Sequence, residues 1–191
     1  MVMSFFKEAI LEPPARWARF RRSIELLPKK RLALLDLGSG PRGELGLVLG
    51  DRLKKYIAID PLFVAGRAPK HWQVISRKIG KKIPLPSESV DAVVSTAFIE
   101  HVDQPREIMA EAVRVLKKGG RLILTTPTPR AKRLLEFLAF GLGWLSRREI
   151  AEHRNYFDRD GLKRLLAGLP VKRIQHRYFE LGLNNLLLVI K

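Results

Sequence analysis

The stretch that decides the fold is residues 34–43, LLDLGSGPRG. An apolar run broken only by Asp36 leads directly into Gly38, Gly40 and Gly43. A short apolar run that stops at glycine is typical of a buried parallel strand. Glycine permits the positive φ of a tight turn and lets the backbone approach a ligand, and a helix that follows offers free N–H groups. The stretch therefore predicts a strand, a ligand-binding turn and a helix in succession.

Strands and helices alternate along the rest of the chain. We expect strands at residues 33–37, 56–60, 72–76, 90–97 and 121–126, and a first helix at 44–53. Another helix begins near Pro105, where Asp103 is placed to cap it and Lys117, Lys118 and Gly119 to close it. This alternation predicts a parallel α/β sheet.

The two ends of the chain add to this sheet. Residues 1–31 form a basic helical segment whose amphipathic helix ends before Pro28 and packs at a sheet edge. Near the C-terminus, Asp158 caps a helix, and strands at 171–180 and 185–190 are close enough for an antiparallel hairpin.

The region around the third strand is short. The connection that precedes it holds Pro61, Gly66 and Pro69, and a parallel crossover usually needs about a dozen residues or more. The stretch that follows, residues 77–89, lacks helical periodicity. We therefore expect a sheet that is trimmed around strand three.

Length and composition set further limits. The 191 residues fit a single domain, and 36 Lys plus Arg against 19 Asp plus Glu give a net charge of +17, which favours anionic partners. The absence of cysteine excludes disulfides, thiolate metal sites and cysteine nucleophiles. The longest apolar run, residues 137–145, is far shorter than the roughly 20 residues of a membrane-spanning helix. We expect a cytoplasmic protein, with peripheral contact to an anionic membrane as a further hypothesis.

Polar residues follow the predicted strands. Asp60 stands at the end of the second strand, 20 residues after Gly40, which is the spacing at which a carboxylate reaches ribose hydroxyls. His101 follows the fourth strand, and His153 and Tyr156 precede the helix capped by Asp158. In open α/β sheets these strand ends meet at the ligand site.

Five segments in order resemble one family across about residues 33–169. They are LLDLGSGPRG, YIAIDP, LPSESVDAVVSTAFIEHVDQP, VRVLKKGGRLILTTP and EHRNYFDRDGLKRLL. The chain resembles the class I S-adenosylmethionine (SAM)-dependent methyltransferases, most closely the type 11 group, which acts on small molecules and lipids. The resemblance implies a Rossmann-like, mostly parallel sheet of seven strands whose last strand is antiparallel.

The resemblance also implies a set of residues that bind SAM. Asp36 and the glycine turn would hold its methionine part, Asp60 its ribose, and residues 96–98 would line the sulfonium side. The complete set is Asp36, Gly38, Ser39, Gly40, Asp60, Pro61, Thr96, Ala97 and Phe98. The Asp that usually binds the adenine amino group is missing, since Ile79, Gly80 and Lys81 occupy that stretch.

The implied activity is methyl transfer to a small-molecule or lipid-linked acceptor, with no metal. Because the sulfonium is already activated, the protein chiefly aligns the reactants, and a base is needed only where the acceptor loses a proton. His101 and His153 are the candidate bases, each with a structural role as the alternative, and Tyr156 could orient the acceptor. Residues 130–157 form an acceptor-side insert or lid, whose apolar stretch suits a membrane surface, a lipid tail or a buried cover.

Three alternatives remain open from the sequence. A dehydrogenase would share the glycine turn, but no Tyr is followed four residues later by Lys. A nucleic-acid methyltransferase would explain the positive charge, but the basic residues are scattered and the Pro-Pro-aromatic motif is missing after the fourth strand. A SAM-binding protein without turnover would fit the trimmed region and the missing adenine Asp.

Overall fold

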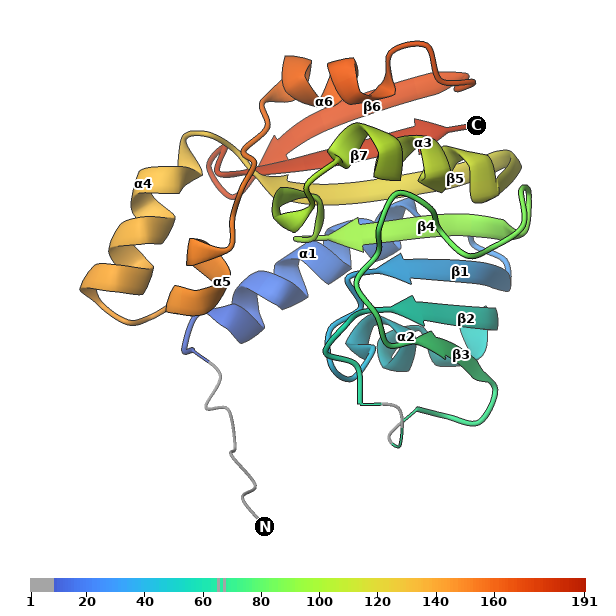
Figure 1. Cartoon of the computed structure of the whole chain (residues 1–191), viewed down its shortest axis with the longest axis horizontal. Helices are drawn as coiled ribbons and strands as arrows, with labels where there is room; N and C mark the ends of the chain where they lie inside the picture. Colours follow the sequence, from blue (N-terminus) through green and yellow to red (C-terminus); the bar gives the residue numbers. More distant parts are fainter. Residues whose placement is uncertain (1–8, 65, 67) are drawn as a thin grey trace.

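A seven-stranded sheet forms the centre of the computed structural model, which describes residues 9–64, 66 and 68–191 (Figure 1). Its order is β3-β2-β1-β4-β5-β7-β6. The strands are β1 (Leu32–Leu37), β2 (Leu53–Ile59), β3 (Trp72–Ile75), β4 (Val90–Thr96), β5 (Leu116–Pro127), β6 (Arg173–Phe179) and β7 (Asn184–Ile190). The first five pair in parallel, and β7 runs antiparallel between β5 and β6. The predicted Rossmann-like sheet with its antiparallel C-terminal hairpin is confirmed.

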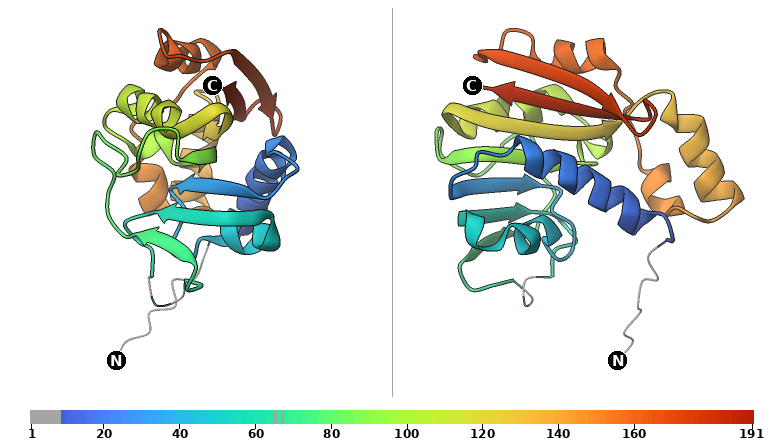
Figure 2. Two further views of the ribbon diagram at one scale, coloured as in Figure 1. Left: turned by 90° about the vertical axis from the view of Figure 1, so that its right-hand side faces the viewer. Right: turned by 180° about the vertical axis from the view of Figure 1, so that it is seen from behind.

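Helices cover both faces of the sheet (Figure 2). One face carries α1 (Glu12–Leu26) and α2 (Glu44–Leu49), and the other carries α3 (Pro105–Val115) and α6 (Arg159–Leu166). Each face has its own apolar core, one around Phe20 and Leu45 and the other around Met109 and Leu162. Because α1 lies against β4, β5 and β7, it crosses a face of the sheet rather than its edge, contrary to the sequence-based expectation.

Several predicted boundaries move. Gly50 has a φ of +47° and ends α2, so a short 3₁₀ turn replaces the last part of the predicted helix and β2 begins at Leu53. The predicted helix closure at residues 117–119 is instead the start of β5, where Gly119 donates a hydrogen bond to the Lys191 carbonyl. Asp103 does not cap α3, because its carboxylate pairs with Arg154 and Lys78. The Asp158 cap of α6 is confirmed, with a 2.7 Å bond from the Gly161 N–H.

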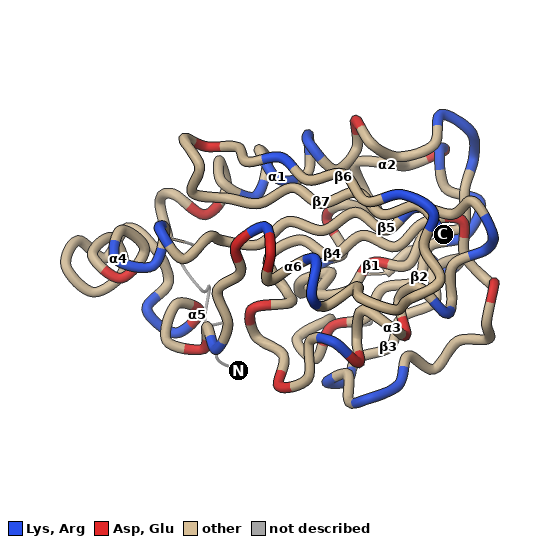
Figure 3. The backbone as a smooth tube through the Cα atoms, turned by 90° about the horizontal axis from the view of Figure 1, so that it is seen from above, with Lys and Arg blue, Asp and Glu red and all other residues tan. Residues whose placement is uncertain are grey.

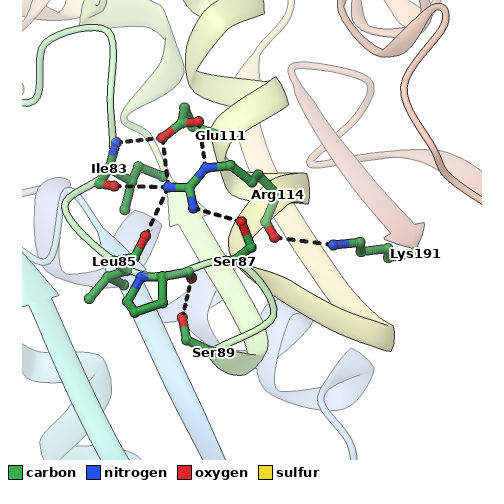
Figure 4. Close-up of polar contacts among 8 residues, drawn as sticks. Ile83, Leu85, Ser87, Ser89, Glu111, Arg114 and Lys191 are labelled. Carbon is green, nitrogen blue, oxygen red and sulfur yellow. Dashed lines mark hydrogen bonds and ion pairs between the residues drawn. The ribbon is translucent and has the colours of Figure 1, made fainter.

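The trimming around β3 is also confirmed, since the described residues on either side of this strand contain no α-helix. Polar contacts from α3 hold the connection to β4 in its place (Figure 4). Arg114 donates to the carbonyls of Ile83 and Leu85 at 3.0 and 2.9 Å, and it pairs with Glu111, which accepts from the Ile83 N–H. These side-chain bonds satisfy backbone N–H and C=O groups of the connection. In a crossover helix, the helix's own hydrogen bonds would satisfy such groups.

The chain between β5 and α6 extends beyond the carboxyl ends of the strands (Figure 1). It comprises α4 (Ala131–Glu136), the π-helical turn η4 (Phe137–Gly141) and α5 (Arg147–Ala151). Within the described residues, no helix combines the length and the apolar character that spanning a bilayer requires.

Candidate functional site

A cavity of about 730 Å³ opens at the carboxyl ends of the parallel strands. Its floor includes Gly38 after β1, Asp60 after β2 and Thr96 at the end of β4. The strand order reverses between β1 and β4, which is where open α/β sheets bind ligands. The volume is within the usual range of small-molecule sites, roughly 300 to 1,000 Å³. Helix α1 and the segment from α4 to α5 supply the rest of the wall.

The glycine turn and Asp60 form one end of the cavity. Gly38 and Gly40 have φ values of +74° and +71°, which an L-side chain adopts only with strain. A Cβ on Gly38 would lie 2.7 Å from that of Phe98, whereas one on Gly40 would meet nothing within 4 Å. The Asp60 carboxylate accepts the Gly40 N–H at 2.9 Å and the Leu62 N–H at 2.8 Å. Each of its oxygens keeps a lone pair for a ligand hydroxyl.

Most of the predicted cofactor residues lie on this wall: Gly38, Gly40, Asp60, Pro61, Thr96, Ala97 and Phe98. Asp36 and Ser39 are buried beneath it. Asp36 accepts a hydrogen bond from the Tyr56 hydroxyl, and burial raises the pKa of its carboxyl to about 7. Its direct contact with a ligand stays a prediction. Ile79, where the adenine-binding Asp is missing, lies on the wall and offers an apolar contact instead.

Both predicted histidines also line the cavity. The rings of His101 and His153 are 4.7 Å apart between centroids, and the His153 Nδ1 lies 3.1 Å from the Tyr156 hydroxyl oxygen. The backbone N–H groups of Arg154 and Asn155 donate to the Glu100 carbonyl at 2.9 and 3.1 Å. These bonds fix the His153 loop against the end of β4, so the two sequence-distant histidines are held together. The Tyr156 hydroxyl contacts His153, but Tyr156 does not itself line the cavity.

Both imidazoles are neutral at pH 7. Burial lowers the pKa of His153 to about 4, with the nearby His101 and the Arg19 charge adding to the effect. Burial also lowers the pKa of His101. Each ring therefore has one nitrogen lone pair that is available to accept a proton or a hydrogen bond.

Several charged residues that the sequence analysis did not single out also line the cavity, among them Arg19 of α1 and Glu100. Glu100 is fully buried, and its Oε2 accepts from the Thr126 hydroxyl at 3.1 Å while its Oε1 has no partner. Burial raises the pKa of its carboxyl to about 7. Nothing in the sequence distinguishes Arg19 from the other basic residues of α1, because only the packing of that helix places it at the cavity.

One group in the described part of the chain has the spacing of a metal site. A ligand atom from each of Glu100, His101 and His153 lies within 4.8 Å of the others. Such a donor set suits transition metals. However, the Arg19 guanidinium lies close enough to lower the pKa of His153, and the same positive charge opposes a dication at this position.

Comparison with known proteins matches a methyltransferase-domain family to residues 11–169. The chain belongs to this methyltransferase family. An uncharacterized methyltransferase of Mycobacterium leprae is 35% identical over 98 residues, and one of Mycobacterium tuberculosis is 33% identical over 97 residues. These alignments cover 48% of the present chain and only 36% and 38% of the two relatives.

Solved structures agree with the fold. A SAM-dependent methyltransferase of Archaeoglobus fulgidus superposes with a TM-score of 0.70 at 16% identity. The superposition covers 93% of the present chain and 94% of the Archaeoglobus chain. One of Thermotoga maritima has a TM-score of 0.68 at 21% identity, covering 93% and 89%. Membership of a methyltransferase family implies SAM as the cofactor.

Proposed function

We propose that this methyltransferase transfers the methyl group of SAM to a small-molecule or lipid-linked acceptor with an apolar body and a reacting hydroxyl. The observation that carries the proposal is an apolar part of the cavity wall. The segment between β5 and α6 supplies Leu134, Leu135, Leu138, Leu145 and Ile150 to this wall. An acceptor with a hydrocarbon part gains from covering such a surface, at roughly 25 cal/mol per Å².

The residues at the glycine end fit the cofactor. The backbone of Gly38 and Gly40 lies open to the methionine part, and Asp60 has lone pairs left for the ribose hydroxyls. SAM supplies an activated methyl group on sulfur, so the protein chiefly has to orient the acceptor and exclude water. Thr96, Ala97 and Phe98 also line the cavity, and we propose that the sulfonium and the acceptor meet beside them.

His153 is the base that this arrangement favours. If its Nδ1–H donates to the Tyr156 oxygen, 3.1 Å away, its Nε2 carries a lone pair that can accept the hydroxyl proton. A base that is oriented by a third group has the arrangement found in many enzymes that activate a hydroxyl. His101 is held differently, by a hydrogen bond to the Glu152 backbone instead of a side-chain hydroxyl, and we assign it to contact with the acceptor.

Calorimetry and label transfer test the proposed function. The protein is expected to bind SAM and S-adenosylhomocysteine, and to transfer label from methyl-labelled SAM into the organic phase of a bacterial lipid extract. Failure to bind either nucleoside at millimolar concentration would contradict the cofactor assignment. Binding without label transfer would support a SAM-binding protein without turnover. Label in added DNA or RNA alone would favour a nucleic-acid methyltransferase.

The distribution of charge favours a lipid over a nucleic acid. Lys and Arg lie around the whole periphery of the molecule and form no single stripe (Figure 3). Around the segment between β5 and α6, by contrast, basic residues accompany exposed apolar ones. Phe137 and Phe140 are 59% and 48% exposed, and Lys132, Arg133 and Arg147 flank them. We propose that this surface contacts an anionic bilayer, from which an apolar acceptor reaches the cavity.

Vesicle sedimentation tests the membrane contact. The protein is expected to bind phosphatidylcholine vesicles that contain phosphatidylglycerol, and to bind pure phosphatidylcholine much more weakly. The double variant Phe137→Ser/Phe140→Ser should bind the vesicles at least about tenfold more weakly. Each Phe side chain that the bilayer buries contributes roughly 1.5 to 3 kcal/mol to binding. Leu47→Ser/Val48→Ser is the matched control, since these α2 residues are 56% and 47% exposed. Equal losses in both variants would contradict a specific surface.

A further inference from the structure

We propose that Arg19 binds an anionic group of the acceptor, a carboxylate or a phosphate, so that the substrate is an anionic amphiphile. The inference rests on the proposed function and narrows its substrate class. It starts from a guanidinium that α1 places on the cavity wall beside Glu100 and His153.

The side chain of Arg19 has unused hydrogen-bonding capacity. Its Nε is buried and has no hydrogen-bond partner, and no ion pair within the described part of the chain joins its guanidinium to a carboxylate. Burial lowers the pKa of Arg19, which is the expected effect of removing a charge from water. A buried charge without a partner is costly, and it becomes favourable when a ligand supplies the counter-charge.

Arg16 provides the contrast within the same helix. It lies one turn before Arg19 and also lines the cavity, but its Nε forms an ion pair with Glu44 at 2.6 Å. Both arginines therefore line the cavity, but among the described residues the protein supplies a carboxylate that offsets the charge of Arg16 and none that pairs with Arg19. Of these two arginines, Arg19 is the one whose charge a ligand can meet.

The acidic residue with the strongest electrostatic effect on Arg19 is Glu100, and it does not replace a ligand. Burial raises the pKa of the Glu100 carboxyl to about 7, so this carboxyl readily takes up a proton and then no longer offsets the charge of Arg19. The charges of Glu180 and Glu149 raise the pKa of Arg19, whereas the charge of Arg16 lowers it. Glu180 accepts a hydrogen bond from the Asn184 side chain.

A carboxylate or phosphate satisfies the groups that remain. A guanidinium binds either group through two parallel N–H···O bonds. A protonated Glu100 can donate to the same anion through the oxygen that now has no partner. The apolar wall from α4 to α5 then covers the hydrocarbon part, and the neutral ring of His153 lies beside the head group, where a neighbouring hydroxyl would react.

Binding of four dodecyl amphiphiles tests the inference. The protein saturated with S-adenosylhomocysteine is titrated by calorimetry with dodecanoate, dodecyl phosphate, dodecanol and dodecyltrimethylammonium. We expect one of the two anions to bind at least about tenfold more tightly than dodecanol and the cation to bind most weakly, because charge-assisted hydrogen bonds are about twice as strong as neutral ones. The stronger anion identifies the head group as carboxylate or phosphate.

Variants assign the preference to Arg19. Arg19→Gln should weaken binding of the preferred anion about 10- to 100-fold and leave dodecanol unchanged, and Arg19→Lys should recover part of the loss. Arg16→Gln should keep the preference for the anion. Equal binding of anion and alcohol, no binding of any amphiphile, or an unchanged preference in Arg19→Gln would each overturn the inference. If the wild-type protein does not bind S-adenosylhomocysteine, this result would instead contradict the proposed function.

Discussion

Replacing His153 by glutamine is expected to slow methyl transfer about 100-fold or more, because a positioned general base typically contributes between about 100- and 10,000-fold. The measurement is the single-turnover transfer of label from methyl-labelled SAM into the lipid extract at saturating SAM. Glutamine keeps a polar group of similar reach but cannot take up the hydroxyl proton. Calorimetry with S-adenosylhomocysteine should give an unchanged dissociation constant, since His153 is not among the residues that we assign to the cofactor.

The pH dependence distinguishes His153 from its neighbours. Because the pKa of His153 is lowered to about 4, the wild-type rate should stay level through neutral pH and fall only as the pH drops toward that value. A fall centred near pH 7 would contradict His153 as the base and indicate a buried carboxyl, Glu100 or Asp36. Tyr156→Phe should cause a smaller loss than His153→Gln, because the imidazole loses only its orienting contact. A His153→Gln rate close to that of the wild type would exclude the base role.

The glycine turn and the carboxylate beside it could be predicted from the sequence because their determinants are local. The strand, the glycines and the carboxylate at the end of the next strand follow one another within residues 32–60. The spacing of 20 residues between Gly40 and Asp60 corresponds to a direct contact, the 2.9 Å bond from the Gly40 N–H to the Asp60 carboxylate. Asp36 shows the limit of this reasoning, since the motif does not reveal that its carboxyl is buried against Tyr56.

The acceptor end depends on contacts between distant parts of the chain. Glu100 and His153 come together because the Arg154 and Asn155 N–H groups donate to the Glu100 carbonyl, which no local pattern encodes. Arg19 is one of several basic residues in α1, and helical periodicity alone assigns it to a solvated face. The position of α1 across the sheet, rather than at its edge, is what brings this charge to the cavity.

Asp60→Ala is expected to weaken binding of S-adenosylhomocysteine by about one to two orders of magnitude. A single charge-assisted hydrogen bond to a ribose hydroxyl contributes roughly 1.5 to 3 kcal/mol, which already corresponds to a loss of this size. The change has a second effect, because the Gly40 and Leu62 N–H groups lose the carboxylate that fixes the glycine turn. Calorimetry at fixed pH and salt gives the dissociation constant directly.

Two further variants separate the ribose contact from the support of the turn. Asp60→Asn removes the charge but keeps one acceptor oxygen, so it should retain part of the turn's hydrogen bonding and bind with intermediate affinity. Asp51→Ala, at an exposed residue of the 3₁₀ turn before β2, controls for the loss of a negative charge from this basic protein. Urea unfolding of each ligand-free variant measures how much stability the turn itself loses. If Asp60→Ala binds S-adenosylhomocysteine as tightly as Asp51→Ala does, Asp60 does not contact the cofactor, and the ribose must be held by backbone groups of the turn alone.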